Sequence, residues 1–257
     1  MIYSHHFNVL TRTPKRGRPK NKLWLGVELE FETIGLVKTE NYLESSRSFH
    51  ARGLLNGFGK FLTPKDDSTI IFGYELVSAP ATLRIHQAEW PKVWAWEGFK
   101  NYSASQYCGL HVHVSRSAFL ESDMLYFFHY FINSKDNHEL IVDLAGRESE
   151  RWCRKYEKPK DRVVMCNYAI DTRYEAVNTL NKKTLEVRIF ASTTKLELFL
   201  SRLEFVDAVA NWVTSDRTLT VKVLREQEFA RFVETHKKKY EHFWNWLTHY
   251  FAKKVAH

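Results

Sequence analysis

Carboxylates and imidazoles alternate with apolar residues in four short runs of this sequence. A period of two is typical of a β-strand, in which every second side chain points to the same face. In the run at residues 108–115, His111 and His113 therefore share one face, and apolar residues take the other. The same spacing groups Glu28 with Glu30 and Glu32 in GVELEFE, places Glu75 in YELVSAP, and groups Glu186 with Arg188 in TLEVRIF. Because clustered carboxylates repel one another, a face that gathers them predicts a bound cation.

Each run taken alone also has a plainer interpretation. A half-solvated antiparallel sheet produces the same alternation without any site, and a histidine pair on a strand is commonly a surface pair. Zinc held by Cys108, His111 and His113 is a further alternative, although this cluster lacks an obvious fourth ligand. The occurrence of all four runs in one chain favours the cation site.

The order of the runs resembles that of the amidoligase family, a branch of the carboxylate-amine ligases related to glutamine synthetase and glutamate-cysteine ligase. The resemblance extends over about residues 23–193 and rests on GVELEFE, DDST at 66–69, YELVSAP, GLHVHVS and TLEVRIFAST. It implies a catalytic domain of the glutamine synthetase-like type. Asp67 stands where the family usually has glycine, so the DDST loop departs from the family pattern.

The resemblance also implies a role for each candidate residue. Carboxylates from several strands would bind two divalent ions, together with the first histidine of GLHVHVS. The second histidine and two arginines would contact the phosphates of ATP. The implied metal ligands are Glu28, Glu30, Glu75, His111 and Glu186; the phosphate contacts are His113, Arg173 and Arg188, of which both arginines are catalytic; the substrate contacts are Asp66, Ser68 and Asn178.

The chemistry of these residue types agrees with the implied roles. Mg²⁺, or Mn²⁺ in its place, prefers oxygen ligands and is commonly held by one or two carboxylates plus substrate phosphates. Transfer of the γ-phosphate to a carboxylate needs metal and arginine to neutralise the developing charge. The resulting acyl phosphate could be displaced by an amine to give an amide. No GxxxxGK[ST], GxGxxG or GxSxG motif occurs, so the predicted ATP site is of another kind.

The sequence therefore predicts an ATP- and Mg²⁺-dependent ligase. Its substrates would be small-molecule or peptide carboxylates and amines, which the sequence does not identify further.

The positive charge of the chain is concentrated at its N-terminus. The chain carries a net charge of +8, and residues 1–22 contain six basic residues and no acidic one. The segment TPKRGRPKNK resembles an AT-hook, whose arginine lies in the minor groove of A·T-rich DNA. A basic lead-in could equally cover ATP phosphates or an acidic substrate. The alternative hypothesis is a DNA-associated protein that contacts DNA through residues 12–22, either without catalysis or as a ligase modifying nucleic acid or a bound protein.

Hydrophobic periodicity places helices between the candidate strands. Helices are expected over residues 39–55, 83–99, 119–133, 135–145, 195–212 and about 240–251, the one at 135–145 being polar. Strands that keep one apolar face, combined with such helices, predict an α+β fold. Its curved, mostly antiparallel sheet would carry helices on the convex face. The charged segment 146–162 is expected to be either a solvated connector or a flap that closes over substrate.

Composition sets the outer limits. With 257 residues and 44% hydrophobic content, the chain can bury a full core. Residues 23–257 are therefore expected to form a single domain behind the basic arm at 1–22. The sequence shows no membrane-spanning run, no signal peptide and no CxxC pair. These features predict a cytoplasmic protein with no membrane partner, and they leave the oligomeric state open.

Overall fold

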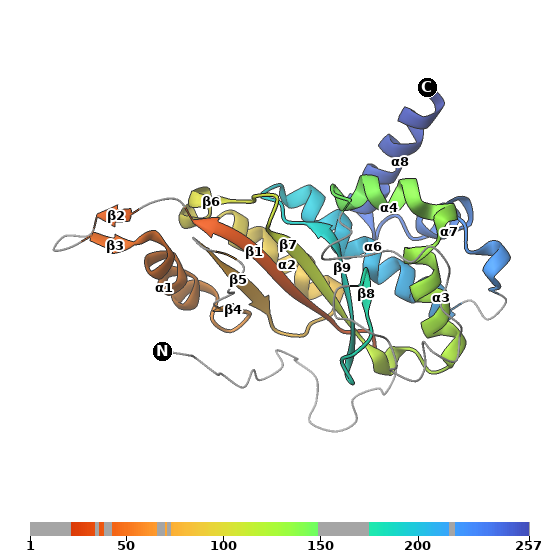
Figure 1. Cartoon of the computed structure of the whole chain (residues 1–257), viewed down its shortest axis with the longest axis horizontal. Coiled ribbons are helices and arrows are strands. Elements are labelled where there is room, and N and C mark those ends of the chain that lie inside the picture. The colour runs from red at the N-terminus through yellow and green to blue at the C-terminus, as the bar shows by residue number, and fades with distance from the viewer. Residues whose placement is uncertain are drawn as a thin grey trace.

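An antiparallel sheet forms the centre of the fold (Figure 1). The computed structural model describes residues 22–33, 36–38, 43–65, 70, 73–148, 175–215 and 219–256. Seven strands pair in the order β4-β5-β1-β7-β9-β8, with β6 as a further partner of β1. Every pairing in this sheet is antiparallel, which confirms the expected type of sheet. The strands are β1 (Leu25–Thr33), β4 (Leu62–Lys65), β5 (Gly73–Ser78), β6 (Tyr102–Ser103), β7 (Gly109–Ser115), β8 (Val177–Asn178) and β9 (Thr184–Ala191).

Two long helices cover the apolar face of the sheet. α2 (Leu83–Trp94) and α6 (Leu196–Ser215) lie behind the strands in Figure 1. The rings of Phe31 in β1 and Trp94 in α2 are 6.4 Å apart, and those of Trp90 in α2 and Phe199 in α6 are 4.8 Å apart. Burial of this aromatic surface is the main force that holds the helices to the sheet. The other α-helices of the described residues are α1 (Ser46–Phe58), α3 (Ser122–Asn133), α4 (His138–Ala145), α7 (Glu226–Thr235) and α8 (Glu241–Ala256).

The pairing of β7 with β9 contains one irregularity. The partners on either side of it are Leu110 with Phe190 and Val112 with Val187. His111 therefore faces two residues of β9, Arg188 and Ile189. Such a β-bulge shifts the alternation of side chains by one residue. In a regular strand, residues 186, 188 and 190 would all point to one face. The bulge leaves Glu186 and Arg188 on the polar face and turns Phe190 to the opposite face, where it is buried.

The predicted helix at 39–55 is wrong in its first part. Residues 36–38 (β2) and 43–45 (β3) pair as a separate two-stranded sheet, and α1 begins only at Ser46. The helix continues to Phe58, three residues beyond its expected end at residue 55. A Cβ on Gly53 would lie 2.5 Å from the Trp96 ring. Glycine at this position therefore allows close packing of α1 against the Trp96 ring.

Three other helices are shorter than their patterns predict, and one of them, α3, begins at Ser122 and not at residue 119. α2 ends at Trp94, and a 3₁₀ turn at Glu97–Asn101 takes up the rest of the segment expected at 83–99. α4 begins at His138, after a 3₁₀ turn at Lys135–Asn137. It is amphipathic and not polar, because Leu140, Ile141 and Leu144 are buried. The burial of these apolar side chains therefore determines which face of α4 packs against the rest of the protein.

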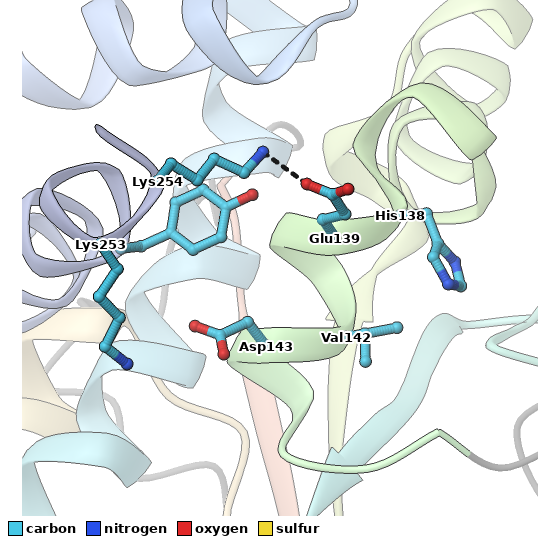
Figure 2. Close-up of a pocket in the computed structure, with 7 residues that line it drawn as sticks. His138, Glu139, Val142, Asp143, Lys253 and Lys254 are labelled. Carbon is cyan, nitrogen blue, oxygen red and sulfur yellow. Dashed lines mark ion pairs between the residues drawn. The ribbon is translucent and has the colours of Figure 1, made fainter. Parts of the chain in front are cut away.

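A pocket of about 530 Å³ lies between α4 and α8 (Figure 2). Lys254 of α8 reaches across to Glu139 of α4, with 2.9 Å between Nζ and Oε2. The pocket is lined by His138, Glu139, Val142, Asp143, Tyr250, Lys253 and Lys254. The polar residues of the sheet do not border it, so the candidate chemistry does not coincide with this cavity. Within the described residues, the structure has no helix whose length and apolarity would allow it to cross a membrane.

His86 of α2 joins this helix to the start of β1 and should make the fold sensitive to acid. Its Nε2 donates to the carbonyl oxygen of Leu25 at 3.1 Å, and its Nδ1 accepts from Trp90 Nε1 at 3.0 Å. Complete burial lowers the pKa of His86 from 6.5 to about 4. Between these values the unfolded chain takes up a proton that the folded protein excludes. The contribution of neutral His86 to the free energy of unfolding is therefore fully present above pH 6.5 and falls as the pH approaches 4. The loss amounts to about 3 kcal/mol.

The measurement is the free energy of unfolding by guanidinium chloride at pH values from 7 to about 4. Carboxyl groups also titrate in this pH range. A His86→Gln variant therefore serves as the reference, because glutamine has a donor and an acceptor but does not ionise. We expect a flatter dependence on pH in the variant than in the native protein. Equal slopes for the two proteins would contradict the assignment.

Candidate active site

Three neighbouring strand pairings bring the polar side chains together. β1 places Glu28 opposite His111 of β7, and β7 places His113 opposite Glu186 of β9. At the other edge of β1, where this strand pairs with β5, Glu30 lies opposite Glu75. Side chains of directly opposed residues project to the same face of a sheet, so the register alone gathers these groups. The candidate strands predicted from the alternation are therefore adjacent in the fold.

Glu28 lies between the two imidazoles. Its Oε2 is 3.5 Å from Nδ1 of His111, and its Oε1 is 3.1 Å from Nε2 of His113. Nδ1 of His111 is also 3.5 Å from Oε1 of Glu186. Two groups of possible metal ligands result, Glu28 with Glu75 and His111, and Glu28 with His113 and Glu186; the ligand atoms of each group lie within 4.8 Å of one another. Glu28 is the carboxylate common to both.

The two imidazoles satisfy a test for ligation. Nδ1 of His111 and Nε2 of His113 are buried, and neither makes a hydrogen bond of acceptable geometry in the structure. The other nitrogen of His113 lies 3.3 Å from Oγ1 of Thr184, which holds the ring so that Nε2 points at Glu28. A metal-ligating histidine usually has its second nitrogen fixed in this way. Together with the carboxylates, the imidazoles fit a divalent cation that accepts mostly oxygen ligands.

Burial and mutual charge shift the pKa values of these groups in opposite directions. Burial would raise the pKa of Glu28, but the nearby imidazoles of His111 and His113 outweigh burial and hold this pKa well below its usual range. Burial likewise opposes protonation of His113, but Glu28 outweighs it and raises the pKa of this imidazole. Burial and then the negative charge of Glu28 raise the pKa of Glu75 to about 9. Without a cation, Glu75 therefore favours its neutral form at neutral pH.

Glu30 has a different environment from Glu28. Its Oε2 accepts from the backbone N–H of Gly109 at 2.5 Å, and it belongs to neither group of ligands. A Cβ on Gly109 would lie 3.1 Å from Nε2 of His111 and 3.4 Å from Oε2 of Glu30. Glycine at this position therefore leaves room for both side chains. In the structure, the predicted metal ligand Glu30 orients the start of β7.

Glu186 is held by two neighbours. Nδ2 of Asn178 donates to Oε2 of Glu186 at 2.8 Å, and Nη1 of Arg188 donates to Oε1. Asn178, predicted to contact substrate, thus fixes a possible metal ligand. The Nε of Arg188 is buried without a hydrogen-bond partner, so this guanidinium has a donor available on the polar face.

The structure leaves several predicted features undescribed and places another, Cys108, outside both groups of ligands. Asp66, Ser68 and Arg173 lie outside the described residues, as do residues 1–21 of the arm and 149–162 of the expected flap. Cys108 is buried next to Ser105, with 3.6 Å between Sγ and Oγ, and belongs to neither group of ligands. The described residues thus give the zinc alternative no three-ligand group containing a thiol.

Two residues of the site were not predicted. Thr184, which contacts His113, precedes Glu186 by two residues, so the alternation of β9 already places it on the same face. Arg147 donates to the backbone of β9 beside the site. No pattern in the sequence marks Arg147, because its position depends on how the end of α4 packs against β9.

In comparisons with known proteins, the matches of this chain are to solved structures. No protein-family model matches the sequence, and no curated protein matches it. Among solved structures, the chain is similar to a novel glutamine synthase homolog, with 12% identity, a TM-score of 0.40, and coverage of 91% of this chain and 68% of that one. It is also similar to a chain in the complex between the prokaryotic ubiquitin-like protein Pup and its ligase PafA, with 12% identity, a TM-score of 0.34, and coverage of 89% and 59%. At these values, the likeness carries no argument about the activity of this chain.

Proposed function

We propose that this chain is an ATP- and Mg²⁺-dependent ligase that joins a carboxylate to an amine through an acyl phosphate. The observation that carries the proposal is the position of Glu28 between the imidazoles of His111 and His113, where it belongs to two overlapping groups of possible metal ligands. Paired divalent ions beside the partly buried Arg188 suit phosphoryl transfer, in which charge on phosphate oxygens must be neutralised. We further propose the glutamine synthetase-like fold type, with the helices on the convex face.

The described residues take distinct parts in this scheme. Glu28, Glu75 and His111 would hold one ion, and Glu28, His113 and Glu186 the other. The ions would shield the phosphates and polarise the γ-phosphoryl group. This assignment makes His113 a metal ligand, whereas the resemblance to the amidoligases implies a phosphate contact.

Arg188 completes the scheme as the phosphate contact. Its Nη1 is engaged by Glu186, and its buried Nε is directed at no acceptor in the structure. A phosphate oxygen near Nε would therefore gain a charge-assisted hydrogen bond and remove an unsatisfied buried donor. Roles for Arg173 in phosphate binding, and for Asp66 and Ser68 in substrate binding, stay predictions from the resemblance.

The test combines nucleotide turnover with chemical trapping. The full chain is incubated with ATP, Mg²⁺ and a panel of carboxylates, with hydroxylamine as the amine. An acyl phosphate reacts with hydroxylamine to give a hydroxamate, and we expect this product together with one ADP for each hydroxamate. Omission of ATP or addition of a chelator should abolish both products. If calorimetry detects no binding of Mg²⁺-ATP, the proposal is wrong whichever carboxylates were chosen.

A further inference from the structure

The β-bulge beside His111 interrupts the hydrogen bonds between β7 and β9 at Arg188 and Ile189. Arg147 lies at this interruption. Its Nη2 donates to the carbonyl oxygen of Arg188 at 3.0 Å, and its Nε donates to that of Ile189 at 3.3 Å. A guanidinium presents its donors in a planar fork and can therefore hold two neighbouring carbonyls at once. Arg147 fixes the bulge from outside the sheet.

The approach of Arg147 to the bulge is itself fixed by the fold. Gly146 ends α4 in the left-handed conformation, with a φ of 69°, and turns the chain toward β9. Arg202 of α6 donates to the carbonyls of Leu144 and Ala145 at the end of α4. It also donates to the carbonyl of Ala191 at the end of β9, so α4 and β9 are held to the same buried guanidinium.

Arg147 also borders the polar face. The position of a Cβ on Gly109 would be 3.1 Å from Nη2 of Arg147 and 3.1 Å from Nε2 of His111. The guanidinium therefore lies close to the first candidate histidine while it holds the backbone of Arg188. Of the described residues, Arg147 thus connects the candidate site with the end of α4.

We propose that Arg147 is a positioning residue of the candidate active site, which holds the bulge so that Arg188 and Glu186 face the histidines. This inference rests on the proposed function for its catalytic meaning. Without Arg147, the carbonyls of Arg188 and Ile189 lose these donors, and the bulge can relax toward a regular pairing. A regular pairing would either turn Glu186 and Arg188 together away from the histidines or bring Phe190 onto the polar face.

The test compares Arg147→Met with Arg116→Met. Arg116 is a matched control because it also donates to two backbone carbonyls, those of Asn181 and Thr179, but away from the bulge. We expect turnover at saturating ATP to fall about 10- to 100-fold in Arg147→Met, a loss typical of groups that orient metal-site residues. Arg116→Met should retain near-native turnover. Arg147→Lys should be intermediate, because an ammonium cannot match both carbonyls in one plane.

Two further readouts distinguish positioning from general destabilisation. An Arg147→Ala variant leaves space for a guanidinium ion, and millimolar guanidinium should restore part of its turnover but none of that lost in Arg147→Met, whose side chain fills this space. Hydrogen exchange of the Arg188 amide, which donates to the carbonyl of Ala176, should accelerate in Arg147→Met and not in Arg116→Met. Turnover losses that are equal in both methionine variants would overturn the inference.

The exchange measurement also separates this inference from the proposed function. If the native protein shows no turnover but exchange at Arg188 still depends on Arg147, the proposed function fails and the positioning of the bulge stands. If exchange is unchanged in Arg147→Met, the positioning role is wrong even in an active enzyme.

Discussion

Replacement of Glu28 by Gln should lower the affinity of the protein for Mn²⁺ by about 100-fold or more and reduce turnover at least as strongly. The reason is geometric. Glu28 contributes to both groups of possible ligands, so its loss removes a carboxylate from each. An amide keeps the size of the side chain but supplies one neutral oxygen in place of a charged pair, and it no longer balances the two imidazoles.

The measurement is a titration with Mn²⁺, followed by electron paramagnetic resonance or calorimetry, and the matched control is Glu32→Gln. Glu32 lies on the same strand and face, but its Oε1 accepts from Ser105 and it belongs to neither group. The control should bind Mn²⁺ like the native protein. Equal affinities in Glu28→Gln and Glu32→Gln would remove the basis of the proposed site.

A Glu30→Gln variant tests whether Glu30 binds metal, as the resemblance implies, or only holds the backbone of Gly109. The resemblance implies that Glu30 binds metal, whereas the structure shows it accepting from the N–H of Gly109. A loss of Mn²⁺ affinity similar to that of Glu28→Gln would support the implied role. A smaller loss of Mn²⁺ affinity would support the two groups of possible ligands found in the structure, neither of which contains Glu30.

Replacement of Arg202 by Met should destabilise the fold by about 3 to 5 kcal/mol, because it removes a buried charge from the carbonyls that compensate for it. Arg202 is 2% exposed and donates to three carbonyls at distances of 2.7 to 2.9 Å. Burial, followed by the nearby charge of Arg147, lowers its pKa to about 10, so the side chain is still charged at neutral pH. Methionine fills much of the volume but leaves those carbonyls without donors.

Urea unfolding at neutral pH measures this loss, and Arg225→Met is the control. Arg225 is half exposed and pairs with Asp136 at 3.3 Å, so its removal should cost less than about 1 kcal/mol. A loss for Arg202→Met no larger than that of the control would show that water replaces its hydrogen bonds without cost.

The strands that carry the candidate site could be predicted from the sequence because they obey a strict alternation. β1, β5, β7 and β9 each keep one apolar face, and the hydrophobic effect fixes which side of each strand is buried. Their antiparallel pairing then brings Glu28, His111 and Glu186 together. Alternation within a strand says nothing about its neighbour, however, so the placement of Glu30 opposite Glu75 could not be predicted.

The parts that could not be predicted depend on tertiary contacts. The bulge in β9 has no local signal, because it arises from the register of two strands that are distant in sequence. The same holds for Arg147, which reaches the bulge only because α4 ends against β9. The hairpin of β2 and β3 was missed because its strands have only three residues each, too few for a period to be recognised.

All five residues in the two groups of possible ligands lie on strands of the central sheet. A sheet held by backbone hydrogen bonds is stiff, so these side chains keep their positions when the connections between strands change. If the chain is the ligase proposed above, its reaction chemistry and its choice of substrate could then be altered independently. A designer could exchange a connecting segment to admit a new carboxylate or amine, and the metal-binding groups would serve unchanged as a reusable catalytic frame.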